Sequence, residues 1–388
     1  MNELQNELDE LDRQGLRRFW RCVEAVDGGR ILIDGQWRVH MASNNYLGLA
    51  AHPRVVAAAR EALEQYGAGA GSARLIGGTF PPHEQLEEEL ARFKQAEAAI
   101  VFPTGYMANL GIITTLTGPE DLLIGDRLNH ASLIDACRLS RASFRVYPHL
   151  DAEKLNDLLK QRRAKYRRVL IIAEGLFSMD GDCSPLKEIS ELARQYDAWL
   201  MIDDAHGTGV LGKTGRGSLE AAGVSPDGIL QMGTLSKAIG SVGGYLAGPK
   251  AAVELIKNKA RSFIFTTALP PACAAAAHEA LRVIQQEPAI REQLWNNVRH
   301  WTQGLKKMEL PLVSDNSPIV PVQVGDNRLT MEIAQSLFEQ GVYAPGIRPP
   351  TVPEGQARIR TSVTALHTPD DLDNALKVFE KTIGVIHR

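Results

Sequence analysis

The sequence predicts an α/β fold in which helices cover a mostly parallel sheet, followed by a smaller C-terminal α+β unit. Five short apolar runs rich in branched residues lie in the middle of the chain, at 98–102, 122–124, 169–173, 198–202 and 228–232. Helical segments of about ten or more residues separate most of these runs, a rhythm typical of parallel sheets. A helix-rich segment at 270–308 then precedes two further strand-like runs, at 319–324 and 357–363.

Length and composition narrow the class of protein. The 388 residues predict two to three domains at about 150 residues each. Lys and Arg total 43 against 46 Asp and Glu, so the near-neutral balance argues against a protein built mainly to bind nucleic acid or coat an anionic membrane. The four cysteines lie far apart, which favours reduced thiols and a cytoplasmic location over a disulfide framework or zinc site.

The N-terminal region predicts a helix and a hairpin. Residues 1–18 (MNELQNELDELDRQGLRR) place leucines at 4, 8, 11 and 16 on one face of an amphipathic helix. Their alternating charges lack the apolar core of a secretion signal, and no run in the chain approaches the about 18 apolar residues of a membrane span. Residues 32–41 predict a hairpin around the Asp34-Gly35 turn.

Glycine and proline mark the next segments. A helix is expected at 53–66, with Pro53 at its start and Gly67 just past its end. Residues 67–78 (GAGAGSARLIGG) form a loop that lets the backbone approach another group closely, and 83–94 return to a helical pattern. Near the C-terminus, 343–355 (YAPGIRPPTVPEG) hold four prolines and predict a stiff loop.

Each central run ends on residues capable of chemistry. Residues 104–106 follow the first run, Asp126, Glu174 and Asp203 follow the next three, and 234–237 follow the last. Ligands of parallel sheets bind beyond the carboxyl ends of the strands. We therefore expect these residues to meet at one edge of the sheet.

One literal motif match points to another class of protein. Residues 207–214 (GTGVLGKT) fit GxxxxGK[ST], the phosphate loop of nucleotide-binding proteins. A true phosphate loop follows its strand directly and opens a helix, whereas residues 215–217 (GRG) disfavour a helix start here. Asp203 and Asp204 also place negative charge nearby. We interpret 207–214 as a surface loop and keep a P-loop-like nucleotide binder as a distant alternative.

A stronger constellation joins 198–206 (AWLMIDDAH) to 234–237 (TLSK). The first run delivers Asp203 and, three residues later, His206, and the next run delivers Lys237. This combination is what a pyridoxal phosphate (PLP) site needs. The lysine forms a Schiff base, and burial lowers its pKa towards that of a useful base. The carboxylate keeps the pyridine nitrogen protonated, which makes the ring an electron sink.

The chain resembles the α-oxoamine synthases, a family of fold-type-I PLP enzymes, over nearly its whole length. The shared motifs, in the family's order, are SNNYLGL (43–49), GDRLNHASL (125–133), EGLFSMDGD (174–182), DDAHGTGV (203–210), TLSKAIG (234–240) and RIRTSVTALHT (358–368). The resemblance implies an N-terminal helix and hairpin arm at 1–48, a large PLP-binding domain at 49–285 and a small C-terminal α+β domain at 286–388.

Within the family, IRPPTVPEG (347–355) most resembles the biotin-pathway members. This implies condensation of L-alanine with pimeloyl-CoA or pimeloyl-ACP to give 8-amino-7-oxononanoate, CoA or ACP, and CO2, in a cytoplasmic homodimer with shared active sites. The alternative is 2-amino-3-ketobutyrate CoA ligase or another family member that uses glycine or serine, since 74–90 resembles the ligase about as well. A catalytically silent partner subunit is a third alternative, disfavoured by the intact lysine, aspartate and histidine set.

The resemblance also implies roles for single residues. Lys237 would carry the Schiff base and act as acid and base at the substrate Cα. Asp203 would pair with the pyridine nitrogen, and His206 with the phenolic oxygen of the ring. His130 would stack on the ring face and contact the substrate, with a core histidine as the alternative, and Ser178 would touch the polar edge of the ring.

Phosphate and substrate contacts complete the expected site. Gly105, Tyr106 and Thr234 would hold the phosphate, because a glycine at a helix start leaves the backbone amides accessible to an anion. Either Thr267 or the adjacent Thr266 would reach the phosphate from a second subunit.

The resemblance implies four further residues on the substrate side of the site. Arg360 would bind the α-carboxylate of the amino acid, since its planar fork suits two oxygens, with Asn44 assisting. Arg21 and Thr351 match substrate-contact positions, although a basic helix face would also explain Arg21. No metal is expected.

Overall fold

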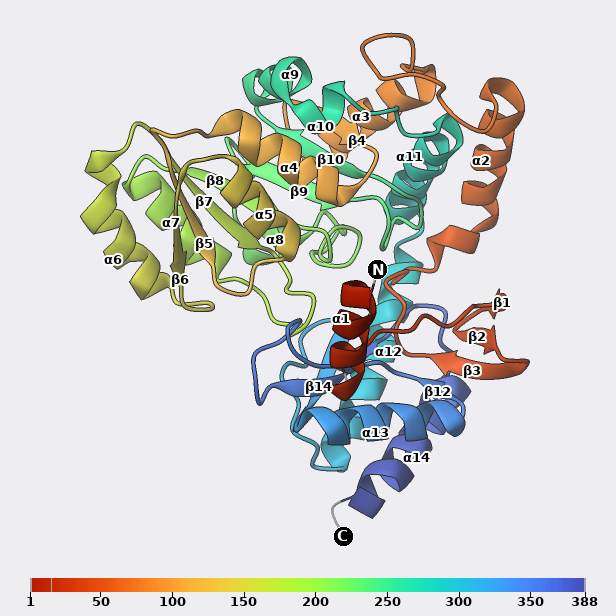
Figure 1. The fold of residues 1–388 in the computed structure, drawn as a ribbon. Helices are drawn as coiled ribbons and strands as arrows, with labels where there is room; N and C mark the ends of the chain where they lie inside the picture. Colours follow the sequence, from red (N-terminus) through yellow and green to blue (C-terminus); the bar gives the residue numbers. More distant parts are fainter. Residues whose placement is uncertain (1, 15, 387–388) are drawn as a thin grey trace.

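The computed structural model describes residues 2–14 and 16–386 of the chain. Its centre is a seven-stranded sheet with helices on both faces (Figure 1). Its strands along the chain are β4 (Ala98–Phe102), β5 (Leu122–Asp126), β6 (Ser143–Tyr147), β7 (Val169–Glu174), β8 (Trp199–Asp203), β9 (Leu230–Thr234) and β10 (Gly244–Gly248). In space they follow the order β4-β10-β9-β8-β7-β5-β6, and only β10 runs antiparallel to its neighbours. The prediction of a mostly parallel sheet is confirmed.

The sequence pattern missed two of these strands. β6 (SFRVY) lies at the edge of the sheet, and most of its side chains are half-buried or exposed, so it carries no apolar run. β10 (GYLAG) is fully buried, but two of its five residues are glycines, which have weak strand propensity.

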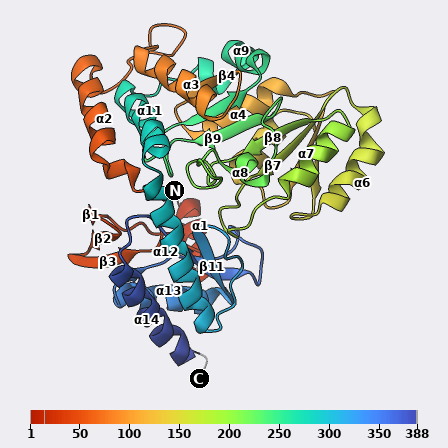
Figure 2. The ribbon, with the colours of Figure 1, turned by 180° about the vertical axis from the view of Figure 1, so that it is seen from behind.

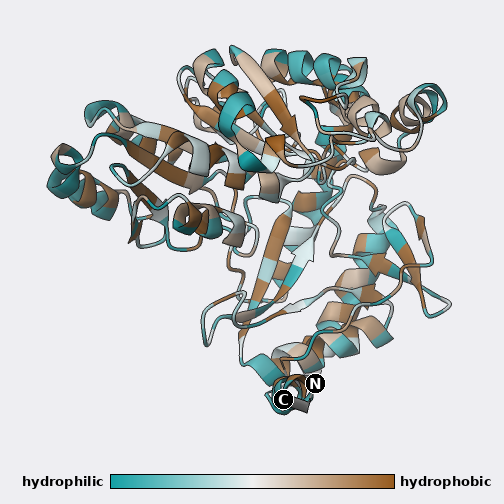
Figure 3. Ribbon diagram, turned by 45° about the horizontal axis from the view of Figure 1, so that its top comes forward, coloured by the Kyte–Doolittle hydropathy of each residue, from teal (hydrophilic) through white to brown (hydrophobic). Residues whose placement is uncertain are grey.

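Alternate side chains of the strands pack into two separate helical layers. On β7, Val169, Ile171 and Ala173 face one layer, whereas Leu170 and Ile172 face the other. The first layer is made by α6 (Ala152–Arg162), α7 (Leu186–Gln195) and α8 (Ser218–Ala222), and the second by α4 (Gly105–Leu116), α5 (Ala131–Leu139), α9 (Lys250–Lys259) and α10 (Arg261–Ile264). Figure 3 shows apolar strands between helices whose outer faces are hydrophilic.

Three further helices, α2 (Pro53–Tyr66), α3 (Pro81–Phe93) and α11 (Pro271–Gln286), pack together beside β4 and β10. The helix predicted at 53–66 is confirmed at both ends, and Gly67 terminates it with a φ of 81°. The glycine-rich segment 67–78 forms no helix or strand, as expected. From α11 the chain continues into α12 (Pro288–Lys307), which leads to the C-terminal part of the molecule (Figure 2).

Two small sheets complete the fold. The C-terminal one, in the order β11-β14-β13, packs with α12, α13 and α14, and the N-terminal one has the order β1-β2-β3-β12. Their elements are β1 (Ala25–Asp27), β2 (Arg30–Ile33), β3 (Gln36–His40), β11 (Ile319–Gly325), α13 (Asn327–Glu339), β12 (Val342–Tyr343), β13 (Gly346–Ile347), β14 (Ala357–Ser362) and α14 (Pro369–Ile386). Strand β12 comes from the C-terminal part of the chain and pairs with β3 of the N-terminal arm, so these two parts share a sheet. The domain boundaries at 48 and 285 stay a prediction.

The remaining elements are short or peripheral. The predicted hairpin is confirmed, and both turn residues, Asp34 and Gly35, have positive φ. Helix α1 (Asn2–Arg13) is shorter than expected, so Leu16 lies beyond it, and Met1 and Gly15 fall outside the described residues. The 3-10 turns are η1 (Leu49–Ala51) and η2 (Arg163–Lys165). The proline-rich loop 343–355 contains no helix, and none of the helices in the described residues could cross a membrane.

Candidate active site

The parallel strands deliver acidic and polar residues to one edge of the large sheet, as predicted. Asp126, Glu174, Asp203 and Thr234 are the last residues of β5, β7, β8 and β9, and all four are buried. Glu174 and Asp203 are register partners on adjacent strands. Gly105 starts α4 beside them, just after β4. The carboxyl edge of the sheet is therefore the place where chemistry is concentrated.

Lys237 lies in the loop after β9 and contacts a buried histidine. Its Nζ is 2.8 Å from Nε2 of His206, whose Nδ1 is 2.8 Å from the hydroxyl of Tyr46. Burial lowers the pKa of Lys237 to about 8, although Asp203 and Glu174 oppose the shift. Burial also holds the pKa of His206 well below its usual value, and the cation of Lys237 lowers it further. The amine is therefore more available as a nucleophile or base near neutral pH than an exposed lysine.

Asp203 is a buried carboxylate with neutral partners. Its Oδ2 accepts a hydrogen bond of 2.9 Å from the side-chain amide of Asn109, and its Oδ1 accepts one of 3.0 Å from the backbone of Ala205. Only 4% of the residue is exposed, and within the described part of the chain it forms no ion pair. A buried unpaired carboxylate is costly, so this site is complementary to a ligand that brings a cationic N–H.

His130 is anchored at the same edge while remaining exposed. It caps α5, because its Nδ1 accepts a hydrogen bond from the backbone N–H of Ser132. The backbone N–H of His130 donates to the carboxylate of Glu174. The hydroxyl of Ser132 also contacts Asn109 at 2.9 Å, which links His130 to Asp203 through two side chains. The predicted ring stacking would use this exposed imidazole.

The start of α4 lies at the same edge of the sheet, with its free backbone N–H groups in the first turn. Thr104 caps the helix by accepting the N–H of Met107, and Gly105 and Tyr106 provide the first turn. A Cβ on Gly105 would lie 3.3 Å from Cε of Met232 and 3.4 Å from Oγ1 of Thr234. The helix start is thus packed closely against the end of β9.

The other two predicted phosphate ligands have additional partners. Thr234 donates to the carbonyl of Gly243 at 2.8 Å, and its hydroxyl lies 2.8 Å from that of Ser236. The hydroxyl of Tyr106 hydrogen-bonds to Asp135, which raises the pKa of the phenol. Tyr106 is 43% exposed, so its ring lies at the surface of the site.

Arg360 comes to the site from β14. Its Nε donates to the Ser178 carbonyl at 2.6 Å, and its two terminal nitrogens contact Ser362 at 2.8 Å and the Asn44 side chain at 3.3 Å. Only 5% of the residue is exposed, and no carboxylate in the described residues pairs with it. A guanidinium has five N–H donors, so it retains donors for a substrate carboxylate. The Ser178 carbonyl thus holds the guanidinium, and the expected contact of Ser178 with the ring stays a prediction.

Arg21 and Thr351 lie together in a groove of about 1100 Å³ between α1 and the proline-rich loop. The guanidinium of Arg21 stacks 3.8 Å from the Phe338 ring, and Thr351 accepts a bond of 3.4 Å from Arg18. The groove borders the strand of Arg360, whose N–H donates to Pro345 in the groove wall. The structure therefore brings Arg21 and Thr351 together, and their substrate role stays a prediction.

Thr267 lies in the loop between α10 and α11 and is exposed, whereas Thr266 is half-buried. The choice between them as a contact to a second subunit stays open.

Two residues that hold this site together were missed by the sequence analysis. Tyr46 lies two residues after Asn44 in SNNYLGL and contacts His206, and Asn109 binds Asp203. Asn109 is an amide inside the largely apolar α4, a buried polar residue that could have signalled a partner.

In the segment that matches the phosphate-loop motif, backbone N–H groups already bind a carboxylate of the protein itself. The backbone N–H groups of Thr214 and Arg216 donate to the carboxylate of Glu220 at 3.0 Å, and the Thr214 hydroxyl adds a bond of 2.8 Å. The next helix, α8, starts only at Ser218. The interpretation of 207–214 as a loop is confirmed, but its surface position is wrong for 207–211. These residues are buried because Val210 and Leu211 pack into the apolar core, and only Lys213 and Thr214 are exposed.

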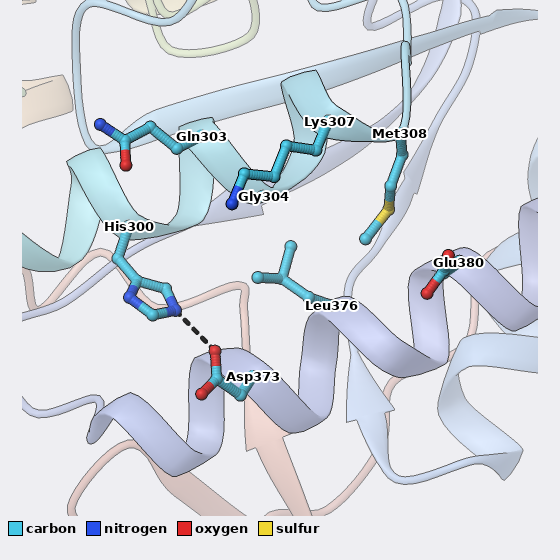
Figure 4. A pocket seen from close by; sticks show the side chains of 8 residues that line it. All are labelled: His300, Gln303, Gly304, Lys307, Met308, Asp373, Leu376 and Glu380. Carbon is cyan, nitrogen blue, oxygen red and sulfur yellow. Dashed lines mark hydrogen bonds and ion pairs between the residues drawn. The ribbon is translucent and has the colours of Figure 1, made fainter.

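A separate hollow of about 400 Å³ lies between α12 and α14 (Figure 4). It is lined by surface groups such as His300 and Asp373, which are 2.7 Å apart. No predicted site residue lines it. The chemistry is therefore assigned to the edge of the large sheet.

The comparison with known families decides the family. A model described as aminotransferase class I and II matches residues 38–379, which is most of the chain. The chain belongs to the aminotransferase class I and II family. This family member is 46% identical to the 8-amino-7-oxononanoate synthase of Thermoanaerobacter pseudethanolicus over 378 residues, 97% of this chain and 96% of that one.

Solved structures confirm the fold of this family member. Serine palmitoyltransferase from S. paucimobilis with bound PLP-myriocin aldimine has a TM-score of 0.94 and 35% identity, covering 99% of this chain and 98% of that one. The 8-amino-7-oxononanoate synthase of Francisella tularensis has a TM-score of 0.78 and 30% identity, covering 90% and 99%. The expected fold-type-I architecture is confirmed.

Proposed function

We propose that this family member is an 8-amino-7-oxononanoate synthase that uses PLP to join L-alanine to a pimeloyl thioester, releasing CO2 and the thiol of CoA or ACP. One observation carries the proposal: Lys237 contacts His206 at 2.8 Å near Asp203, a buried carboxylate that forms no ion pair within the described residues. The relatives that bear this enzyme name are similar over nearly the full chain.

The residues at the sheet edge fit PLP. Asp203 would accept the pyridine N–H, which supplies the cationic partner that the carboxylate lacks. The start of α4 at Gly105 and Tyr106, with Thr234, would bind the phosphate. His206 would hydrogen-bond the phenolic oxygen. When bound, PLP supplies an electron-withdrawing ring that stabilises negative charge at the substrate Cα.

The remaining groups would handle the substrate. Lys237 would bond to the aldehyde carbon of the cofactor in the resting enzyme. Its Nζ would accept the proton from the Cα of alanine and later return a proton to the same carbon, which its lowered pKa favours. Arg360 would hold the alanine carboxylate until it leaves as CO2. His130 would cover the ring and exclude water.

We further propose a cytoplasmic homodimer. Thr267 or Thr266 would reach the phosphate of the partner subunit. The cytoplasmic location agrees with the four free cysteines, Cys22, Cys137, Cys183 and Cys273.

A matrix of amino acids against acyl thioesters tests the proposed reaction. L-Alanine, glycine and L-serine are each combined with pimeloyl-CoA, pimeloyl-ACP, acetyl-CoA and palmitoyl-CoA, and thiol release is measured with product mass. The proposal expects the highest kcat/KM for L-alanine with a pimeloyl thioester. A clear preference for glycine with acetyl-CoA, or for serine with palmitoyl-CoA, would assign the chain to another synthase.

A further inference from the structure

A half-buried histidine beside the site, His149, has two carboxylate partners and no role in the chemistry described so far. His149 follows β6, outside every motif used to locate the site. We propose that His149 is a positioning residue for Arg360: it fixes the loop that carries Ser178, whose carbonyl holds the guanidinium. This inference rests on the proposed function, in which Arg360 binds the carboxylate of alanine.

The imidazole of His149 connects the end of β5 to that loop. Its Nδ1 lies 2.9 Å from Oδ1 of Asp126 at the end of β5, and its Nε2 lies 3.0 Å from Oδ2 of Asp182. The side chain of Asp126 is fully buried and also accepts two backbone N–H groups, from Leu128 and Leu150. This end of the connection is therefore rigid.

Both ring nitrogens donate when the imidazole is charged, as two carboxylate partners require. Burial alone would lower the pKa of His149, but the hydrogen bonds to Asp126 and Asp182 raise it to about 10. The ring also lies edge-on against Phe177, with centroids 4.5 Å apart and planes at 88°. The loop is held through an ion pair on one side and an aromatic contact on the other.

The loop itself is closed and short. Leu176 and Cys183 form an antiparallel bridge, and the N–H of Phe177 donates to the carbonyl of Asp182 at 2.9 Å. Ser178 lies between Phe177 and Asp182, the two residues of this loop that His149 contacts. A displacement of either contact would therefore move the Ser178 carbonyl.

On its other side the loop meets the C-terminal sheet. The Ser178 carbonyl accepts Nε of Arg360 at 2.6 Å, and Asp180 pairs with Arg358 at 2.7 Å. The Gly181 carbonyl accepts the hydroxyl of Ser317 at 2.8 Å. The path from β5 to the guanidinium thus runs through His149 and the loop, with a hydrogen bond or a short stretch of backbone at each step.

The test measures KM for L-alanine in the PLP-loaded enzyme with His149→Ala and His149→Gln. Loss of positioning is expected to raise KM for alanine by at least about tenfold in His149→Ala, because small displacements of a substrate-binding group have large effects. The KM for the thioester, the visible absorption band and the affinity for PLP are expected to stay near wild-type values. His149→Gln, which can still donate one hydrogen bond, is expected to lie between the two.

His300→Gln is the matched control. It removes another histidine paired with an aspartate, Asp373 at 2.7 Å, but on the surface between α12 and α14. It is expected to leave KM for alanine unchanged.

A double-mutant cycle separates positioning from general destabilisation. Adding His149→Ala to Arg360→Lys should raise KM for alanine less than twofold further, because the guanidinium that His149 positions is already absent. Full additivity of the two changes, or a fall in kcat and PLP affinity without a change in KM for alanine, would overturn the inference. A wild-type enzyme that does not turn over alanine at all would instead refute the proposed function.

Discussion

At the residue scale, the environment of Lys237 determines when its amine can react. Burial lowers the pKa to about 8, Asp203 and Glu174 oppose this, and the cation of Arg360 adds to it. The protein therefore lowers the cost of deprotonating a lysine that must attack an aldehyde and later remove a proton.

This environment predicts the pH dependence of cofactor capture. In cofactor-free protein the rate of PLP binding to Lys237 should rise with pH, with a midpoint near 8, since only the deprotonated amine attacks. Arg360→Gln should move the midpoint upward, because a cation that disfavours the charged amine is removed. Stopped-flow absorbance across pH measures this. A midpoint near the ordinary lysine value of about 10.4 would contradict the burial argument.

The residues that the sequence could predict are those at strand ends. Asp203 follows an apolar run directly, and His206 and Lys237 lie within five residues of the ends of two such runs, so parallel-sheet topology brings them to one edge. Tyr46 and His149 could not be predicted in this way, because each reaches the site through a tertiary contact from a loop. The stacking, phosphate and carboxylate roles came from the resemblance, and their assignment to single residues remains to be tested.

At the scale of elements, the phosphate-binding position depends on two backbones in contact. A Cβ on Gly244, the first residue of β10, would lie 2.5 Å from the Cα of Gly105 at the start of α4. The backbone of Gly105 cannot move aside for a new methyl group as the end of a flexible side chain could.

Gly244→Ala should therefore displace the first turn of α4. We expect the dissociation constant for PLP to rise at least about tenfold and the free energy of unfolding to fall by about 1–3 kcal/mol, as in other overpacked sites. Gly118→Ala is the control, since a Cβ there meets nothing within 4 Å. Equal PLP affinity in the two variants would show that the start of α4 does not hold the phosphate.

The elements themselves were predictable where pattern and punctuation agreed. The helix at 53–66 has an amphipathic period, a proline at its start and a glycine at its end, and both ends were predicted correctly. The sequence pattern missed β10 because its burial comes from neighbouring strands, a tertiary effect that overrides its own composition.

At the scale of the whole molecule, two histidines join the N-terminal arm to the C-terminal part. His40 at the end of β3 and His367 before α14 both have pKa values lowered to about 4, first by burial. Between about pH 6.5 and 4 the unfolded chain binds protons there that the folded chain does not. The unfolding free energy should therefore fall as the pH falls through this window, by about 3 kcal/mol for each ring.

His40→Phe tests this prediction. The phenyl ring can keep the stacking on Tyr343, which lies 5.8 Å from the imidazole centroid, but it cannot be protonated. Urea unfolding at pH 7 and pH 4 should show an acid-induced loss that is smaller than that of the wild type by up to about 3 kcal/mol. The same loss as in the wild type would remove His40 from the explanation.

The central claim is that Lys237 is the residue that bonds to PLP, and borohydride reduction tests it most directly. The PLP-loaded protein is reduced, digested and mapped by mass spectrometry. The account predicts loss of the visible band and a single pyridoxyl adduct on Lys237. An adduct on Lys213 or another lysine, or protein that stays colourless after PLP is added, would contradict it.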